Sequence, residues 1–527
     1  MKPTGRNRPP VRPAVIYRRS WLAFASFLLL FPLQGCSKEQ TCSLALPSPG
    51  IEVIDVSAPQ RFVAPPHGAL GASTLYYFDD DETLASPALG QALKTAGLTT
   101  LRFPGGELAD NYDWETHSLE RPHAWPGEAA DAAARAARTD YLEFLEFARR
   151  HKIKNLFFVV NVDGAFRAKG NRQENIRKYA EKAARWVAAV KENGFKVSHW
   201  EIGNEPELPG SLPLTAAEYA GALKAFSAAM RAADPEIQIG AAGPNKLNGV
   251  GFADRLTTEQ LAYLRAHGGN SRAACRGLSP TQCVNRIRRA VPGQAQPEPW
   301  WHTVAKLAGD SFDFIAVHRY TLVDPQRAQQ RDGRMHLTAR LQRLRNFLQA
   351  KLRGQVQITV TEWNTPSRKQ SPLSKIRHLL EVAMQLGNNL AGGVDFMHYW
   401  PMRTPSDDFQ PMLASDGSAG PVARLHALVR EAVADSVIAE HMPAPGVYLL
   451  HTDSDQRSGL LAINLNEIPV ALRWQHKRTE ATRIRMLRLH DNGTGQVKES
   501  HCAEHLTAKQ IIPLTLPPSS ASVMNIR

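Results

Sequence analysis

The chain has 527 residues, of which 43% are hydrophobic and 21% are charged, and its formal net charge is +13. This length exceeds one compact core of ordinary size, and the apolar content excludes a largely disordered chain, so we expect a leader followed by two domains. The sequence has no long internal repeat and no low-complexity tract, which excludes a repeat array.

The first 35 residues have the pattern of an export signal. Basic residues precede a short apolar run at Trp21–Leu33, and these 13 residues are too few to cross a hydrocarbon core. The run ends in Leu33-Gln34-Gly35-Cys36, which resembles a bacterial lipobox and implies cleavage before Cys36 and acylation of its thiol. A plain export signal, or a twin-arginine signal at Arg18-Arg19, is the alternative. We therefore expect an exported lipoprotein held at the membrane by its lipid.

Removal of residues 1–35 lowers the formal net charge from +13 to about +7, because this leader contains six basic and no acidic residues. The remaining excess fits an ordinary cationic surface, an acidic polysaccharide as partner, or an anionic membrane. Ser37 stands where some lipoproteins of the inner membrane carry Asp. We expect an outer-membrane or periplasm-facing protein of the bacterial cell envelope.

Four cysteines remain if Cys36 carries lipid, and an even number suits disulfide formation in an oxidising compartment. Cys275 and Cys283 lie eight residues apart in a polar stretch, where a disulfide would close a loop. Cys42 and Cys502 would then tie the start of the mature chain to its end. Free, buried thiols are the alternative.

Short apolar runs alternate with helical patterns over residues 65–425, as in repeated βα units around a parallel sheet. We expect eight strands, at Leu70–Phe78, Thr99–Phe103, Asn155–Val162, Lys196–Ile202, Ile237–Ala242, Phe312–Val317, Gln355–Thr361 and Gly393–Tyr399. A capping box at Thr215–Glu218 and C-cap glycines at Gly194 and Gly354 mark intervening helices. The pattern predicts the α/β class and a (β/α)8 TIM barrel, with the longest gap, Pro244–Trp300, forming a loop over the strand ends.

The pattern changes after a helix near Pro421–Ala434. Alternating strands follow without helices, at Gly446–His451, Gly459–Leu465, Val470–Trp474, Ile484–Leu489 and Ala521–Ile526. We expect a C-terminal β-sandwich domain over residues 426–527. Residues 36–64 form an N-terminal segment in which Ile51–Val56 alternates, and this segment is expected to add a strand to the sandwich.

Two glutamates close predicted barrel strands, where the active site of this fold lies. The fourth strand ends in Gly203-Asn204-Glu205-Pro206 and the seventh in Thr361-Glu362-Trp363-Asn364. A carboxyl group at the end of a buried strand is costly unless it is paired or used, so two facing one mouth indicate a working pair. A helix cap or a salt bridge is the alternative for each. Glu201 and Glu207 are the rival carboxylates of the fourth strand.

These motifs resemble those of the retaining glycoside hydrolases of clan A. Leu101–Gly106 followed by Tyr112-Asp113-Trp114 is similar to the second-strand segment of the clan's α-L-arabinofuranosidases, and further matches end the sixth and eighth strands at His318-Arg319-Tyr320 and Tyr399-Trp400. Pro206 stands where arabinofuranosidases usually have Met, and the nucleophile motif of heparanases lacks Trp-Asn. The resemblance therefore extends to the β-xylosidase and heparanase/β-glucuronidase families and leaves the sugar open.

The resemblance implies a retaining hydrolase that cleaves O-glycosidic bonds of a poly- or oligosaccharide by double displacement. Glu205 would be the general acid and base, and Glu362 the nucleophile. Supporting or substrate-binding roles fall to Arg102, Asn204, His318, Tyr320, Trp363 and Trp400. Arg102 and Tyr320 are expected to lower the pKa of Glu362 relative to that of Glu205, and Glu201 is expected to point into the barrel against Arg102.

No metal-binding or nucleotide-binding motif appears in the sequence, so we expect no metal or other cofactor, and no nucleic acid as partner. The competing hypothesis is a non-catalytic lipoprotein that binds polysaccharide or assists its export. Asp79–Thr83 has the form of a phosphoryl-transfer loop, but it lacks a later Lys and acidic pair. A solvated loop is the expectation there.

Overall fold

The computed structural model describes most of the chain from Gln40 onward. The described residues are 40–41, 51, 53–57, 70–74, 79, 81–121, 139–209, 213–267, 275, 278–322, 336–352, 354–368, 372–404, 410–433, 436–455, 457–475, 483–491, 497–505 and 511–526. The predicted leader, with Cys36, lies outside them. Within these ranges, no helix has both the length and the apolar character that crossing a membrane requires.

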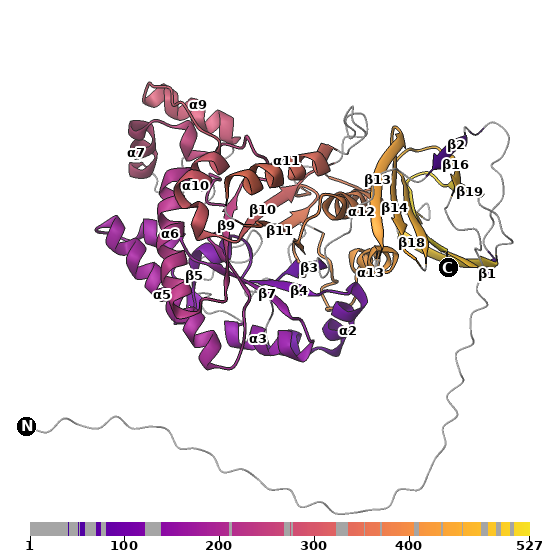
Figure 1. The fold of residues 1–527 in the computed structure, drawn as a ribbon, viewed down its shortest axis with the longest axis horizontal. Coiled ribbons are helices and arrows are strands. Elements are labelled where there is room, and N and C mark those ends of the chain that lie inside the picture. The colour runs from indigo at the N-terminus through magenta and orange to yellow at the C-terminus, as the bar shows by residue number, and fades with distance from the viewer. Residues whose placement is uncertain are drawn as a thin grey trace, which may run out of the picture. The chain divides into compact units, whose positions relative to one another are not determined.

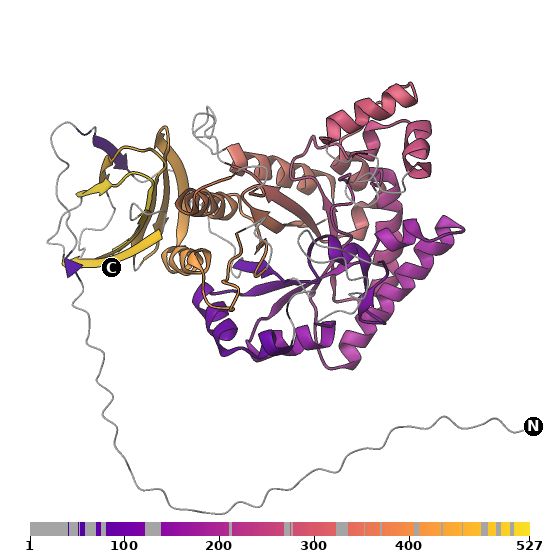
Figure 2. The ribbon, with the colours of Figure 1, turned by 180° about the vertical axis from the view of Figure 1, so that it is seen from behind.

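Eight parallel strands close into a barrel, as the sequence predicts (Figures 1 and 2). In order around the barrel they are β3 (Leu70–Ser73), β4 (Thr100–Phe103), β7 (Asn155–Val160), β8 (His199–Ile202), β9 (Gln238–Gly243), β10 (Phe314–Tyr320), β11 (Gln357–Asn364) and β12 (Phe396–Tyr399). Each overlaps one predicted strand, because strands covered on both faces read as nearly continuous apolar runs. Residues 75–78 of the first prediction lie outside the described residues.

Helices lie between these strands along the chain, a last one follows β12, and together they cover the barrel. They are α1 (Asp81–Ala85), α2 (Pro87–Ala96), α3 (Tyr141–Arg150), α4 (Asp163–Arg167), α5 (Arg172–Glu192), α6 (Ala216–Ala233), α10 (Trp300–Ala308), α11 (His336–Lys351), α12 (Lys375–Ala391) and α13 (Pro421–Val433). The predicted capping box is present, since Thr215 and Glu218 exchange side-chain and backbone hydrogen bonds at the start of α6. Gly194 follows α5 with φ of 76°, the left-handed conformation of a C-cap.

The long gap between β9 and α10 is more than a loop. It contains α7 (Thr258–Ala266) and α9 (Pro280–Ala290), each begun by a capping box, and these helices share a small apolar core with Phe252. A disulfide joins Cys275 to Cys283, with 5.2 Å between their Cα atoms, as predicted. The backbone N–H of Phe252 donates to the carbonyl oxygen of Glu207, so this lobe is tied to the loop after β8.

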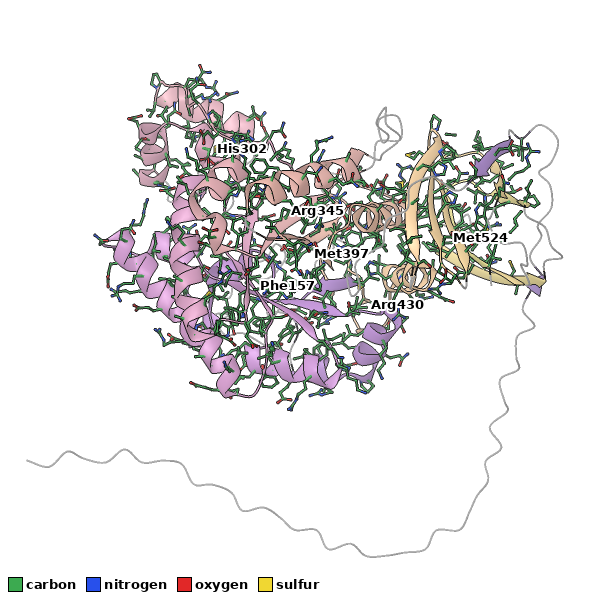
Figure 3. The ribbon with its side chains drawn as sticks, viewed as in Figure 1. Phe157, His302, Arg345, Met397, Arg430 and Met524 are labelled. Atoms are coloured by element: carbon green, nitrogen blue, oxygen red, sulfur yellow. A yellow bond between two sulfur atoms is a disulfide. The ribbon has the colours of Figure 1, made fainter. Side chains whose placement is uncertain are left out.

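The inside of the barrel is filled by layers of side chains, as in other barrels of this kind. Phe157, labelled in Figure 3, packs edge-on against Phe314 and stacks on His199, with 4.2 Å between the ring centroids of Phe157 and His199. Burial lowers the pKa of His199 to about 4, so this imidazole is neutral near pH 7. The next layer toward the C-terminal ends of the strands contains Arg102 and Glu201, both with 0% exposure.

The C-terminal domain is a β-sandwich, as predicted, with a seven-stranded and a three-stranded sheet. The large sheet has the order β1 (Gln40–Thr41), β18 (Val497–His505), β17 (Arg483–Asp491), β20 (Ser520–Ile526), β15 (Ser458–Asn464), β14 (Val447–Asp453) and β13 (Val437–Ala444). The small sheet has the order β19 (Ile511–Leu516), β16 (Val470–Gln475) and β2 (Val53–Ser57). The N-terminal segment thus adds the expected strand, β2, and also β1, while β1, β13, β18 and β19 were missed.

Cys502 lies on β18 opposite Gln40 of β1 and is disulfide-bonded. Cys42 is outside the described residues, so its pairing with Cys502 stays a prediction.

The middle strands of the large sheet, β14, β15 and β20, are buried on both faces. Val447 and Leu449 pack between the two sheets with Met524, which Figure 3 labels, while Tyr448 and Leu450 pack against the barrel side. Helices α12 and α13 lie on that side and contact strands β13, β15 and β20. The predicted domain border at 425/426 therefore falls inside α13, a helix that contacts both α2 of the barrel and the sandwich.

Candidate active site

The register of β10 and β11 brings three predicted site residues to the mouth of the barrel. Val317 pairs with Val360, but the next residue, His318, pairs with Glu362, so β11 has one extra residue at this point. Such a bulge re-aims side chains at the end of a strand. Tyr320, two residues beyond His318, reaches the same glutamate, and its hydroxyl donates to Glu362 Oε2 at 2.6 Å.

Glu205 is placed by a tight turn at the end of β8. Gly203 has φ of 78°, and a Cβ there would lie 2.6 Å from the Val162 side chain. Glu205 itself has φ of 48°, in the left-handed region that non-glycine residues rarely occupy. Strained conformations of this kind gather at functional sites, where the surrounding structure enforces them. Pro206 follows directly and prevents β8 from continuing.

Arg102 is the central cation of the site. Its Nε and Nη2 donate to the two oxygens of Glu201 at 2.8 and 3.0 Å, as the sequence predicts. Its Nη1 donates to Glu362 Oε1 at 2.7 Å, and Nη2 also donates to Asn204 Oδ1 at 2.9 Å. Four charge-assisted hydrogen bonds compensate the burial of this guanidinium and fix the orientation of Glu362 and Asn204.

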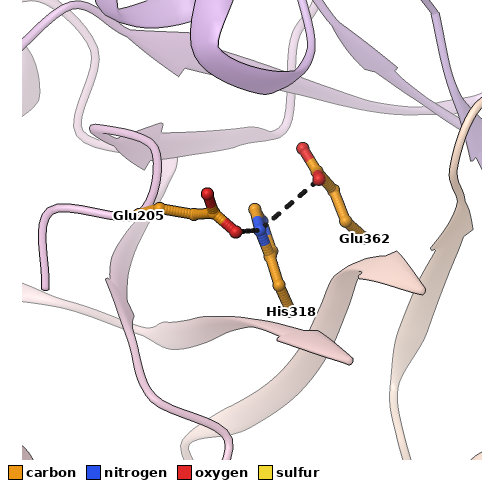
Figure 4. A group of neighbouring side chains, drawn as sticks. All are labelled: Glu205, His318 and Glu362. Atoms are coloured by element: carbon orange, nitrogen blue, oxygen red, sulfur yellow. Dashed lines mark hydrogen bonds and ion pairs between the residues drawn. The ribbon is translucent and has the colours of Figure 1, made fainter. Parts of the chain in front are cut away.

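His318 lies between the two predicted catalytic glutamates (Figure 4). Its Nδ1 is 2.8 Å from Glu205 Oε1 and 3.5 Å from Glu362 Oε2. One atom from each of the three side chains lies within 4.8 Å of the others. The glutamates differ in access to water, since 25% of the Glu205 side chain is exposed and only 5% of that of Glu362.

These charges change the proton affinities within the site. Burial lowers the pKa of His318, but the carboxylates of Glu362 and Glu205 outweigh burial and raise it to about 9. Burial raises the pKa of Glu205, but the hydrogen bond and charge of His318, together with the charge of Arg102, bring it below the ordinary value of glutamate. In the free protein at neutral pH, His318 is therefore protonated and Glu205 is ionised.

This result corrects the expectation that Glu205 itself carries the catalytic proton in the resting protein. The form with imidazolium and carboxylate and the form with neutral imidazole and carboxylic acid differ only in which group holds one titratable proton. Glu205 and His318 therefore titrate as one unit. The proton that a general acid needs is thus present on the pair, on the His318 side.

The three side chains Glu205, His318 and Glu362 are also the group, within the described ranges, whose ligand-type atoms come close enough to hold a metal ion. In this arrangement, the proton on His318 and the guanidinium of Arg102 already supply positive charge to both carboxylates.

Sequence reasoning missed two polar residues that support the site. Asp110, 4% exposed, accepts the backbone N–H of Asn204 at 3.1 Å, next to Glu205. Asp110 belongs to the 3-10 helix Gly106–Asn111, which connects the two motifs that are similar to arabinofuranosidases. Its place between these motifs is the sequence signal that could have identified it. Asn245 follows β9 and donates from Nδ2 to the carbonyl oxygen of His318 at 2.6 Å. No sequence motif marks it.

Of the two tryptophans proposed for the site, Trp363 differs from expectation and the role of Trp400 stays a prediction. Trp363 has 0% exposure and stacks on His426 at 5.6 Å, so it supports β11 from behind and cannot contact a sugar. Trp400, 7% exposed, packs against Gly106, where a Cβ would lie 2.4 Å from its ring. Trp300 and Trp301 are fully buried core residues.

Glu207, the other rival carboxylate of the fourth strand, and Asp79 are both buried. Burial raises the pKa of Glu207 to about 7, and Glu205 contributes to this shift. Asp79 of the phosphoryl-transfer-like segment is 2% exposed and accepts from Arg403 Nε at 2.9 Å, so the expectation of a solvated loop is wrong at this residue.

Comparisons with known proteins agree with this geometry. The family model "Alpha-L-arabinofuranosidase 1 domain" matches residues 92–271, which contain Arg102 and Glu205. Comparison with curated proteins gives no significant match. The fold is shared with the GH51 arabinofuranosidase from Xanthomonas axonopodis pv. citri, with a TM-score of 0.59, 13% identity, and coverage of 90% of this chain and 100% of that one.

Two further solved structures share the fold. The α-L-arabinofuranosidase from Thermotoga maritima, in complex with arabinose, has a TM-score of 0.57, 17% identity, and coverage of 90% of this chain and 99% of that one. The GH30 endoxylanase from Clostridium papyrosolvens has a TM-score of 0.51, 13% identity, and coverage of 90% and 100%. The barrel, the site and the matching domain together define the chain as a glycosidase. Within that class it resembles the clan A glycoside hydrolases, in particular the arabinofuranosidases and xylanases of GH51 and GH30.

The raised pKa of His318 predicts how stability depends on pH. A group whose pKa is higher in the folded state stabilises the protein fully below its unfolded pKa of about 6.5, and this contribution is lost as pH rises through the folded value of about 9. The shift corresponds to about 3 kcal/mol. We expect the Tm to fall between pH 6.5 and 9, and the His318→Gln variant to lack this part of the decline. Equal pH profiles of Tm in both proteins would contradict the assignment.

Proposed function

We propose that this glycosidase cleaves O-glycosidic bonds with retention of anomeric configuration, with Glu362 as nucleophile and Glu205 as general acid and base. The observation that carries the proposal is the distance between them, since their nearest ligand-type oxygens lie within 4.8 Å. Retaining enzymes have carboxyl groups about 5 to 5.5 Å apart, whereas inverting enzymes need about 6.5 to 9.5 Å to admit a water molecule. The spacing therefore favours direct attack by Glu362.

In the first step, a carboxylate oxygen of Glu362 forms a bond to the anomeric carbon while the bond from that carbon to the leaving oxygen breaks. Glu205 gives the leaving oxygen the proton that the Glu205–His318 pair holds. In the second step, Glu205 removes a proton from water, the resulting hydroxide bonds to the anomeric carbon, and Glu362 is released as a carboxylate. Two inversions give net retention.

The supporting residues orient the nucleophile. Arg102 and Tyr320 each donate to one oxygen of Glu362, at 2.7 and 2.6 Å, which fixes the orientation of the carboxylate. Arg102 also donates to the side-chain oxygen Oδ1 of Asn204. This bond orients the Asn204 side chain so that its Nδ2 can donate to a substrate hydroxyl. The ester at Glu362 removes one of the two negative charges that raise the pKa of His318. His318 therefore holds its proton less tightly in the second step than in the first.

For the substrate, we propose an α-L-arabinofuranoside within a poly- or oligosaccharide. The matching domain model is that of an α-L-arabinofuranosidase, and two of the structures that share the fold are arabinofuranosidases. The net charge of about +7 after residue 35 favours a polysaccharide that also carries acidic groups.

The test is hydrolysis of aryl arabinofuranoside, xyloside, glucoside and glucuronide, and of neutral and acidic polysaccharides, by the mature chain with Cys36→Ser. We expect cleavage of the arabinofuranoside, and proton NMR of the first product formed should show the anomer of the substrate. An inverted product would refute the double displacement. Binding of a polysaccharide without cleavage of any glycoside would favour the non-catalytic lipoprotein instead.

We also propose that the enzyme is exported and anchored through acylated Cys36. The sequence Leu33-Gln34-Gly35-Cys36 and the disulfide between Cys275 and Cys283 support an oxidising compartment outside the cytoplasm. Cell fractionation tests this, because the wild type should stay with membranes and the Cys36→Ser variant should be released.

A further inference from the structure

Helix α12 is buried along nearly its whole length and yet carries many polar side chains. The residues concerned are His378, Glu381, Gln385, Asn388 and Asn389, none of which is more than 3% exposed. Buried polar groups cost free energy unless they are hydrogen-bonded, so a helix with five of them is either destabilising or adapted to particular partners. The partners lie on two different sides.

On the barrel side, α12 holds the ends of β10 and β11, the strands that carry His318, Tyr320 and Glu362. Gln385 Nε2 donates to the carbonyl oxygen of Thr321, which follows Tyr320, at 2.8 Å. His378 Nε2 lies 2.9 Å from Asn364 Oδ1, two residues beyond Glu362. Asn389 Oδ1 accepts from the Arg319 guanidinium, and Arg319 lies between His318 and Tyr320. The ends of β10 and β11 are therefore attached to one helix.

On the other side, α12 is attached to the β-sandwich through Glu440 of β13. Asn388 Nδ2 and the Tyr448 hydroxyl donate to Glu440 Oε2 at 2.6 and 2.9 Å, and the Thr338 hydroxyl of α11 donates to Oε1. Gly387 makes this approach possible, because a Cβ there would lie 2.1 Å from the Tyr448 hydroxyl. Three donors converge on one carboxylate at the boundary between the domains.

Glu440 also compensates a buried charge on β10. Arg319 is 3% exposed and forms no ion pair with a described residue. Burial and the neighbouring Arg340 lower its pKa to about 9, whereas the charge of Glu440 acts to raise it. Removal of the Glu440 charge would leave this guanidinium less compensated and would weaken the attachment of β10.

We propose that Glu440 of the β-sandwich is a positioning residue for catalysis, which acts through α12 to set the alignment of β10 and β11 and so of His318, Tyr320 and Glu362. The inference rests on the proposed function for the reaction itself, but the alignment of His318 is measurable without a substrate. The sandwich is thus part of the catalytic apparatus rather than an appended module.

The test compares Glu440→Gln with Glu467→Gln, an exposed glutamate of the same domain. Glutamine presents an NH2 group to one of the three donors and removes the charge. NMR of labelled histidines, with His318→Gln for assignment, should show the pKa of His318 falling by about one unit or more toward 6.5, because its carboxylate partners are displaced. On the substrate found in the glycoside panel, kcat should fall about 10- to 100-fold with KM within about twofold, the result of misplaced groups. Glu467→Gln should change neither.

A lower Tm with unchanged kcat and unchanged His318 titration would overturn the proposal, because Glu440 would then be structural only. If Glu440→Gln does not fold, Gly387→Ala gives a second route. The added methyl group clashes with the Tyr448 hydroxyl, so Gly387→Ala should show the same two changes, and Gly387→Ala with Tyr448→Phe should restore them in part. No restoration would contradict the proposed link. If no glycoside is cleaved at all, the proposed function fails, and the His318 titration still decides on positioning.

Discussion

Replacement of Glu362 by Gln is expected to lower kcat on the order of 10⁵-fold while the protein stays folded. The amide is a poor nucleophile, and its NH2 group must face either Arg102 Nη1 or the Tyr320 hydroxyl, each of which donates to Glu362 at 2.7 or 2.6 Å. Single-turnover kinetics with the glycoside identified in the panel measures the loss. KM should change only a few-fold, because the sugar hydroxyls keep their partners.

Glu236→Gln is the matched control for this variant, since the Glu236 side chain is 74% exposed and pairs with the exposed Lys196. Its activity should equal that of the wild type. If Glu362→Gln retains more than about one percent of kcat with a normal circular dichroism spectrum, Glu362 is not the nucleophile.

Replacement of Glu205 by Gln is expected to lower kcat/KM by about 10² to 10⁴-fold for a polysaccharide, the usual contribution of general acid catalysis. The loss should be much smaller for an aryl glycoside with an acidic phenol, because that leaving group departs without a proton. A ratio of the two losses above ten identifies the acid, and equal losses would rule Glu205 out.

The same variant should change the pH profile. In the wild type, kcat/KM should fall above about pH 9, where the Glu205–His318 pair loses its proton. Glu205→Gln should lack this alkaline limb on the activated substrate. Survival of the limb would place this ionisation on a group other than the Glu205–His318 pair.

The barrel was predictable because its strands are covered on both faces and read as apolar runs, such as Asn155–Val160 with one intermediate and five buried residues. The strands that were missed have a different composition. β18, Val497–His505, contains Lys, Glu, Ser and His among its residues, and β19, Ile511–Leu516, contains Pro513. Strands of this kind follow weaker patterns, because propensity depends on pairing partners that are distant in sequence.

The lobe between β9 and α10 could have been found from the sequence. Thr257 with Gln260, and Ser279 with Pro280 and Gln282, are ordinary start signals for α7 and α9, and both capping boxes form. The stretch was interpreted as a loop because of its polar composition, although its apolar residues Leu261, Val284 and Ile287 make a small separate core.

Local sequence was sufficient to predict that Glu205 and Glu362 face one mouth, because strand ends in a parallel barrel meet at one face and each glutamate directly follows an apolar run. Tertiary structure alone decided where the proton resides, that Trp363 is buried, and that Glu440 contacts α12, the helix that holds the ends of β10 and β11. The reason is physical: a pKa and an exposed fraction depend on groups brought together by folding, such as His318 and Glu205, which lie 113 residues apart in the chain and 2.8 Å apart in the site.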